Sequence, residues 1–249
     1  MKMLLGHEWV DRDDTIDVRD PFDDSLIDTV PAANHDDVET ALATAYAARE
    51  TAREMTTYER AQVLYRTAAI IADQLEDFAT TIAREGSKTI NEARGEARRC
   101  VNTLTIAAEE AKRLQGETIP FDSFPGGEVR RGYYERVPIG VVLAITPFND
   151  PLNLVAHKLG PAIAGGNAVI LKPATVTPLS GLKLAEAFMQ AGLPSGVLQC
   201  ITGYGAVLGD VLVEDPRVRM VSFTGGVEAG ERIMSRVGLK KIGMELGSN

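Results

Sequence analysis

Cysteine is scarce in this 249-residue chain, which has only Cys100 and Cys200. The two residues lie far apart and form neither a CxxC pair nor a spacing that is typical of metal ligands. This excludes a disulfide scaffold, and we expect no metal site. The reducing cytoplasm is the expected compartment, because cytosolic proteins rarely depend on disulfides.

Long apolar runs are also missing. No stretch approaches the roughly eighteen consecutive apolar residues that mark a membrane-spanning helix. The N-terminus reaches Gly6 after only two leucines, which does not resemble a secretory signal peptide. We therefore expect a cytoplasmic protein with no membrane partner.

Basic residues are fewer than acidic ones: the chain has 26 Lys and Arg and 35 Asp and Glu, which gives a net charge of −9. This balance argues against nucleic acid or an anionic membrane as the main partner. The composition is otherwise that of a globular protein, with 45% hydrophobic and 24% charged residues. A chain of this length can form one large domain or two small ones.

The first half of the chain is predicted to be largely helical. Residues 1–30 form short extended pieces separated by turns. Asn34 or His35 is expected to cap a helix that starts near Asp36, and Thr57 is expected to begin a second helix. Two more helices follow, one carrying Phe78, Ile82 and Ala83 and one over about 91–114.

The composition changes over residues 116–138, where glycine, proline and phenylalanine are frequent. Within this segment, residues 128–137 alternate like a pair of strands broken by a glycine.

After Pro138, short apolar strands alternate with helices. This alternation predicts an α/β fold with a doubly wound, parallel, Rossmann-like sheet that is covered by helices on both faces. The predicted strands are 139–146, 167–172, 197–201, 218–223 and 240–246, and the predicted helices are 151–164, 178–191, 206–214 and 228–237.

Ligands bind such sheets beyond the carboxyl ends of the strands. Two strand-to-helix turns carry glycines, at 203–205 and 224–226, and bare amides at helix N-termini suit phosphates. A single glycine is more often a turn residue than a phosphate contact, but two such turns in one sheet favour a nucleotide site. Neither turn has the GxGxxG or GxxxxGK[ST] pattern. Spacing alone therefore indicates only an α/β protein that binds a nucleotide.

Four motifs in register narrow this interpretation: Thr146-Pro147-Phe148-Asn149, Leu171-Lys172-Pro173-Ala174, Phe223-Thr224-Gly225-Gly226 and Glu245-Leu246-Gly247. Their order and spacing resemble those of the aldehyde dehydrogenase superfamily, and the resemblance covers essentially the whole chain. Residues 148–154 followed by Lys158 are most similar to the branch of non-phosphorylating glyceraldehyde-3-phosphate, lactaldehyde and phosphonoacetaldehyde dehydrogenases. The resemblance implies an oxidoreductase that converts an aldehyde to a carboxylic acid with NAD or NADP.

The resemblance also implies three segments. Residues 1–115 would be N-terminal strands and helices packed on the cofactor domain, 116–138 a strand-pair oligomerisation arm, and 139–249 the dinucleotide-binding core. The catalytic domain of the family would be absent, because it follows this part of the fold. We therefore expect the truncated N-terminal half of an enzyme that is a homo-oligomer in its full-length form.

Two catalytic residues follow from the matched motifs. In the family, a cysteine thiolate attacks the aldehyde, the amide that matches Asn149 donates to the resulting oxyanion, and the carboxylate that matches Glu245 activates the hydrolytic water. Neither Cys100 nor Cys200 matches this nucleophile, which would lie beyond Asn249. The isolated chain is therefore expected to have no dehydrogenase activity.

The cofactor would be NAD or NADP, and the neutral Thr175 favours NADP. Many NAD-using relatives carry a glutamate there, which repels a 2′-phosphate. Gly226 is a second departure, because a serine is common at that position. The predicted cofactor-binding residues are Ile145, Thr146, Pro147, Phe148, Lys172, Ala174, Thr175, Gly205, Gly209, Phe223, Thr224, Gly225, Gly226, Ala229 and Leu246.

The helix after Asn149 would line the substrate site. Asp150, Asn153, Leu154 and His157 are the predicted lining residues, and their polarity indicates a small polar or anionic aldehyde. The alternative is a catalytically inactive nucleotide-binding half-chain or remnant that needs a separate C-terminal partner. An unrelated Rossmann-type dehydrogenase would instead show a Tyr-x-x-x-Lys pair or an early GxGxxG, and the sequence has neither.

Overall fold

Five parallel strands form the centre of the fold, which the computed structural model describes over residues 1–247. They are β7 (Val141–Ile145), β8 (Ala168–Lys172), β9 (Leu198–Cys200), β10 (Val218–Gly225) and β11 (Lys241–Leu246). Their order in the sheet is β11-β10-β7-β8-β9, so the chain starts in the middle, runs outward to β9 and returns to the other side of β7. The predicted doubly wound α/β sheet is confirmed, and its switch point lies between β7 and β10.

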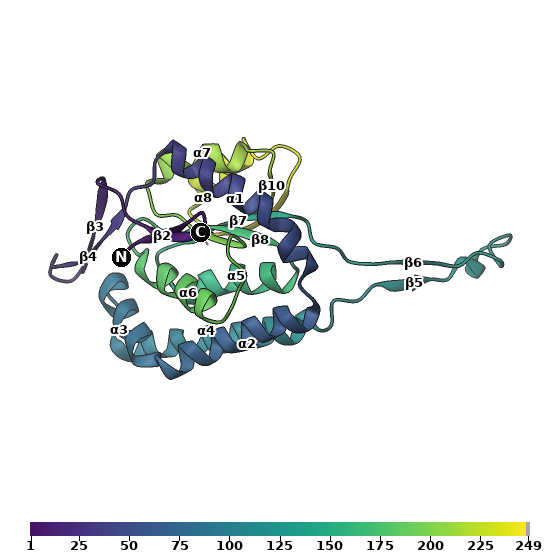
Figure 1. The fold of residues 1–249 in the computed structure, drawn as a ribbon, viewed down its shortest axis with the longest axis horizontal. Coiled ribbons are helices and arrows are strands. Elements are labelled where there is room, and N and C mark those ends of the chain that lie inside the picture. Colours follow the sequence, from purple (N-terminus) through teal and green to yellow (C-terminus); the bar gives the residue numbers. More distant parts are fainter. Residues whose placement is uncertain (248–249) are drawn as a thin grey trace.

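Helices cover both faces of this sheet (Figure 1). One face carries α1 (His35–Glu54), α7 (Gly205–Glu214) and α8 (Val227–Met234), and the other carries α5 (Asn153–Ala164) and α6 (Leu179–Gln190). A further layer of α2 (Thr57–Asp73), α3 (Leu75–Gly86) and α4 (Ile90–Ala111) packs on the outside of α5 and α6. Because α5 and α6 lie between the sheet and this layer, most of their residues are buried.

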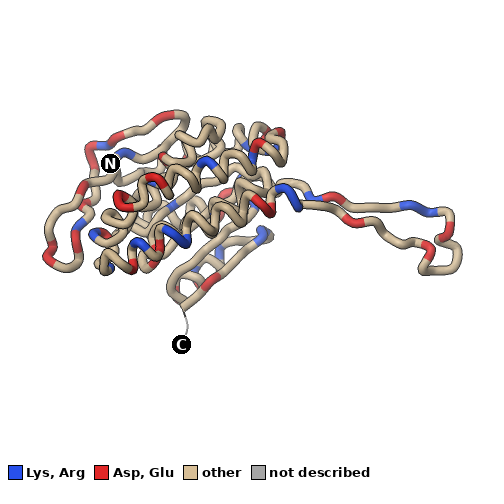
Figure 2. Tube along the Cα trace, turned by 90° about the horizontal axis from the view of Figure 1, so that it is seen from below, with Lys and Arg blue, Asp and Glu red and all other residues tan. Residues whose placement is uncertain are grey.

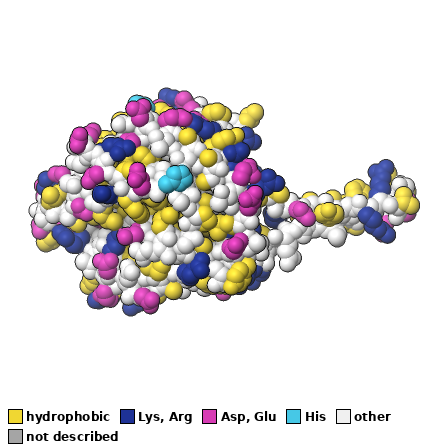
Figure 3. Space-filling view, in the orientation of Figure 1, with side chains coloured by type: hydrophobic (Ala, Val, Ile, Leu, Met, Phe, Trp, Pro, Cys, Tyr) yellow, Lys and Arg dark blue, Asp and Glu magenta, His cyan; other side chains and the backbone are white. Residues whose placement is uncertain are grey.

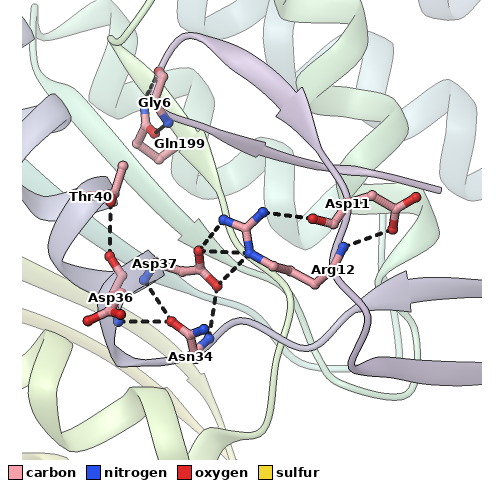
Figure 4. Close-up of polar contacts among 8 residues, drawn as sticks. All are labelled: Gly6, Asp11, Arg12, Asn34, Asp36, Asp37, Thr40 and Gln199. Carbon is pink, nitrogen blue, oxygen red and sulfur yellow. Dashed lines mark hydrogen bonds and ion pairs between the residues drawn. The ribbon is translucent and has the colours of Figure 1, made fainter.

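The N-terminal strands extend the main sheet, which the sequence did not predict. A hairpin of β1 (Met3–Leu5) and β2 (Glu8–Val10) joins the β9 edge antiparallel, with Leu4 opposite Cys200. The Gly6 amide at the hairpin turn donates to Gln199 Oε1 at 2.7 Å (Figure 4). A separate two-stranded sheet is formed by β3 (Thr15–Arg19) and β4 (Leu26–Pro31). Residues 1–30 are thus short strands, as predicted, but two of them belong to the central sheet.

Capping boxes begin three of the helices. Asn34 accepts hydrogen bonds from the amides of Asp36 and Asp37, and Asp37 in turn accepts one from the Asn34 amide and pairs with Arg12 (Figure 4). The second helix begins at Thr57, and its cap is the preceding Thr56 rather than Thr57 itself, because Thr56 and Glu59 bond reciprocally.

The fourth helix ends at Ala111, three residues earlier than predicted. The amides of Lys112 and Arg113 donate to the carbonyls of Glu109 and Glu110. These tighter turns, in which each amide reaches back only three residues, end the α-helix.

A long two-stranded arm projects from the body of the molecule (Figures 1 and 3). Its strands are β5 (Glu117–Ile119) and β6 (Gly132–Tyr134), with a 3₁₀ turn, η1 (Phe121–Ser123), near the tip. The prediction that both strands lie within 128–137 is wrong. Residues 124–130 form turns instead, in which Gly127 bonds to the Phe124 carbonyl and Arg130 to the Gly127 carbonyl.

Acidic and basic residues both occur over the body and the arm (Figure 2), but acidic residues predominate in the N-terminal strands and loops. Within residues 1–247, no helix is both long enough and apolar enough to cross a lipid bilayer.

Candidate functional site

A cleft of about 870 Å³ opens at the carboxyl ends of β7, β10 and β11, next to the switch point of the sheet. It brings together three of the four sequence motifs. Its lining includes Pro147, Phe148, Asn149, Leu154, His157, Lys158, Ser222, Thr224, Gly225, Gly226, Met244, Glu245, Leu246 and Gly247. Ser248 and Asn249, which complete the segment after the Glu245 motif, lie outside the described residues.

Asn149 and Glu245 both reach this cleft from the ends of strands. Asn149 follows β7 in the loop before α5, and Glu245 lies near the end of β11, in register with Thr224 on β10. Both side chains are exposed. Within residues 1–247 the Asn149 amide group has no hydrogen-bond partner, so its N–H donors are available to a ligand in the cleft.

Lys158 enters the cleft from α5 and was not predicted as a site residue. Its Nζ donates to Thr224 Oγ1 at 2.8 Å and to Ser222 Oγ at 3.2 Å. Burial lowers the pKa of Lys158 to about 8, and the negative charge of Glu245 opposes this shift. The signal in the sequence was a single lysine inside an otherwise apolar helix, and such a cation needs polar partners when it is buried.

Two of the four predicted substrate residues turn away from the cleft. Leu154 and His157 line it, whereas Asp150 and Asn153 face α4. The Asp150 carboxylate pairs with Lys88 and with Arg99, and Asn153 Oδ1 accepts from Thr103 Oγ1 at 3.0 Å. Lys88 in the turn before α4 and Arg99 on α4 thus hold Asp150 on the α4 side of its loop. Its carboxylate therefore does not oppose an anionic ligand beside Asn149.

The glycine turns leave room for a ligand. A Cβ atom placed on Gly205 or Gly209 of α7, or on Gly226 at the start of α8, would meet no described atom within 4 Å. Gly225 differs, because a Cβ there would lie 2.5 Å from the Phe223 ring. Open backbone at two helix starts fits the phosphates of a dinucleotide. Ala229 is exposed on α8 beside these glycines.

Lys172, at the end of β8, is buried, with 5% of its surface exposed. Its Nζ donates to the Pro173 carbonyl at 3.2 Å, and burial lowers its pKa to about 8. Ile145 ends the neighbouring strand β7 and Thr146 follows it, and the buried Thr146 hydroxyl has no hydrogen-bond partner among the described residues. An unpaired buried hydroxyl and a poorly paired buried ammonium both favour a polar ligand at this edge.

A second cleft of about 520 Å³ adjoins the first and shares Phe148 with it. It contains Thr175, whose hydroxyl donates to the Gly203 carbonyl at 3.0 Å. Ala174 lies beside it and is partly exposed. The predicted cofactor residues thus lie along the ends of β7, β8, β10 and β11 and in α7 and α8.

Glu85 is a further buried acid at this second cleft that the sequence did not single out. It accepts hydrogen bonds from the amides of Leu179 and Ser180 at the start of α6, both at 2.8 Å. Burial raises its pKa to about 7 despite these hydrogen bonds. Glu85 therefore supplies the N-terminal cap that α6 lacks in its own sequence.

Neither cysteine can act as a nucleophile in this structure. Cys100 and Cys200 are both fully buried, and burial raises the pKa of each thiol. A buried thiol with a raised pKa is neutral and unreactive near neutral pH.

Comparisons with known proteins extend over nearly the whole chain. The sequence profile of the aldehyde dehydrogenase family matches residues 9–249. The chain is 47% identical to the 3-sulfolactaldehyde dehydrogenase of Priestia megaterium over 247 residues, which are 99% of this chain and 51% of that protein. It is 49% identical to aspartate-semialdehyde dehydrogenase 1 of Pseudomonas canavaninivorans over 234 residues, which are 94% of this chain and 50% of that protein.

A solved structure is also similar to this chain over nearly its whole length. The NADP-dependent glyceraldehyde-3-phosphate dehydrogenase of Bacillus halodurans, complexed with NADP, superposes with a TM-score of 0.96 at 39% identity, over 99% of this chain and 52% of that chain. The chain thus spans about half the length of the relatives that it matches.

Proposed function

The chain belongs to the aldehyde dehydrogenase family, and we propose that it supplies the dinucleotide-binding half of an enzyme that oxidises a small anionic aldehyde to a carboxylic acid. The observation that carries this proposal is the common cleft of Asn149, Glu245 and the glycine turn after β10. An amide donor, a carboxylate and a phosphate-binding turn in one cleft are the groups that such an oxidation requires.

In the proposed reaction, a cysteine outside these 249 residues attacks the aldehyde carbon. The Asn149 amide then donates to the oxyanion that develops on the carbonyl oxygen. NAD or NADP, held at the glycine turns that contain Gly205 and Gly226, would supply the hydride acceptor. The Glu245 carboxylate removes a proton from the water that hydrolyses the resulting thioester. The Lys158 ammonium, held by Thr224 and Ser222, keeps a positive charge near Glu245.

The anionic substrate class is supported by the relatives and by the charges near the cleft. The names of the similar proteins specify 3-sulfolactaldehyde, aspartate semialdehyde and glyceraldehyde 3-phosphate, and each of these molecules carries an acidic group. In this chain, the Lys158 ammonium lines the cleft, and the nearby Asp150 is paired with Lys88 and Arg99. The test is oxidation of these three aldehydes by the complete enzyme, with a neutral aldehyde of similar size as the control. Preference for the neutral aldehyde would contradict the proposal.

We expect the 249-residue chain by itself to form no NAD(P)H from any aldehyde, because its two thiols are buried and unreactive. The purified chain should nevertheless bind dinucleotide, which calorimetry can measure. The matched comparison is the same assay after a separately produced C-terminal half of a relative has been added. That half would carry the nucleophile. Formation of NAD(P)H by the chain without such an addition would refute the expectation.

We propose NADP as the preferred cofactor, and Thr175 provides the test. Substitution Thr175→Glu places a carboxylate near the expected 2′-phosphate and should weaken NADP binding about 10- to 100-fold, because like charges at an interface repel strongly. NAD binding should change little. The control is Thr175→Gln, which has similar size and no charge. Calorimetric titration of both dinucleotides gives the dissociation constants, and much tighter binding of NAD than of NADP by the unsubstituted chain would contradict the proposal.

The projecting arm is proposed to join subunits in the complete enzyme. Its two strands have three residues each, pair only with each other within the described residues, and are mostly exposed. An isolated two-stranded ribbon is at best marginally stable in water. A neighbouring subunit would supply the packing that the arm lacks.

A further inference from the structure

The loop that carries Asn149 is fastened to α4 by charged side chains that the proposed reaction does not use. We propose that Lys88, Glu96 and Asp150, which we call the clasp, are positioning residues that hold the Asn149 amide in its donating orientation. The inference rests on the proposed function, because it assigns these residues a role in that same site.

Glu96 fixes the start of α5. Its carboxylate is fully buried, and Oε1 accepts hydrogen bonds from the amides of Leu152 at 2.8 Å and Asn153 at 3.0 Å. Leu152 is the N-cap residue of α5 and provides no side-chain cap. Glu96 therefore satisfies two amides that α5 cannot satisfy itself, and it does so only three residues after Asn149.

Lys88 links Glu96 to the residue next to Asn149. Its Nζ lies 2.7 Å from Glu96 Oε2 and also donates to Asp150 Oδ1. Burial lowers the pKa of Lys88, but the hydrogen bonds to Asp150 and Glu96 outweigh this effect, so that the pKa is raised. Arg99 holds the other oxygen of Asp150 at 2.9 Å. The buried negative charge of Glu96 is thereby compensated, as a buried carboxylate requires.

The backbone conformation of Ser87, just before Lys88, directs the chain toward α4. Ser87 has a φ of 52°, in the left-handed region that few residues other than glycine adopt. This residue ends α3 and redirects the chain, so that Lys88 lies against α4 before that helix begins.

Asn149 lies between two fixed points of the backbone. On one side is the end of β7, and on the other is the turn in which Leu154 donates to the Asp150 carbonyl at 3.1 Å. Because the Asn149 amide has no partner within residues 1–247, its direction depends on the backbone on either side of it. The clasp fixes the second side. A displacement of about 1 Å at a reacting centre can lower the rate about 100-fold.

The test is a pair of substitutions in the complete enzyme, Glu96→Gln and Lys88→Met. We expect kcat to fall about 10- to 100-fold, while the dissociation constants for dinucleotide stay within about twofold. The control is Glu76→Gln, which removes an exposed ion pair between α3 and α4, with Arg94, and should leave kcat unchanged. If Glu96→Gln fails to fold, Lys88→Met carries the test, because the Lys88 side chain is 20% exposed.

A double-substitution experiment separates positioning from general destabilisation. If the clasp acts through Asn149, Glu96→Gln and Lys88→Met should lower kcat by less than about threefold in an Asn149→Ala background. An equal loss of kcat in both backgrounds would overturn the inference.

A different result would overturn this inference and leave the proposed function intact. In that case the parent enzyme is active and Asn149→Ala lowers kcat, but the clasp variants do not lower kcat. An enzyme that is inactive on every aldehyde would overturn the proposed function, and this inference with it.

Discussion

Substitution Asn149→Ala should lower kcat/KM of the complete enzyme about 100- to 1,000-fold, which is the usual cost of removing one donor to an oxyanion. The amide is exposed in the cleft and has no partner within residues 1–247, so it is not needed for folding. The loss should therefore occur with little change in thermal stability or in dinucleotide binding. Initial rates at varied aldehyde concentration, together with a melting curve, measure both effects.

The matched control for this substitution is Asn102→Ala. Asn102 is exposed on α4, away from the cleft, so the same chemical change should leave kcat/KM unaffected. Equal activity of the Asn149 and Asn102 variants would show that the amide at position 149 does not contact the reacting oxygen.

Substitution Glu245→Gln should lower steady-state turnover about 100- to 10,000-fold, because it removes a general base. The first turnover should survive, since Glu245 is proposed to act only on the hydrolytic water. Rapid-mixing measurements should therefore show a burst of NAD(P)H close to one equivalent of enzyme, followed by almost no further formation.

Glu228→Gln provides the comparison for this second substitution. Glu228 is exposed in the first turn of α8 and makes no ion pair within the described residues. Its replacement should preserve both phases. Loss of the burst in Glu245→Gln would assign the carboxylate to the first step instead of to hydrolysis.

The five parallel strands of the central sheet could be predicted from the sequence to within two residues at each end. Most of the strands predicted from 139 onward are short apolar runs, and each is followed within two residues by a glycine or a proline, which is a local signal. The arm could not be predicted in the same way. Its strands have only three residues each, and the partner of Gly132–Tyr134 lies across a turn-rich segment. Pairing of this kind depends on contacts distant in sequence, which periodicity does not report.

For the candidate site, too, some residues could be identified from local sequence and others depend on contacts that are distant in sequence. Asn149 and Glu245 were singled out because their motifs resemble those of the family, and the topology of the sheet brings both residues to one edge. The roles of Lys158, Glu85 and Glu96 depend on how α3 and α4 pack against α5 and α6. Nothing in the local sequence of Glu96 indicates that its carboxylate will cap a helix 56 residues later. The orientation of Asp150 likewise depends on its ion pairs with Lys88 and Arg99, which are distant in sequence, and not on the residues next to it in the chain.

The position of the first hairpin has a consequence for the order in which the chain folds. Gly6 bonds to Gln199 across a separation of 193 residues, so β1 and β2 leave the ribosome before β9 and have no edge to join until β9 exists. Contacts that close such long loops form slowly. The hairpin should therefore dock after the rest of the sheet, and substitutions within it should accelerate unfolding while leaving the folding rate nearly constant.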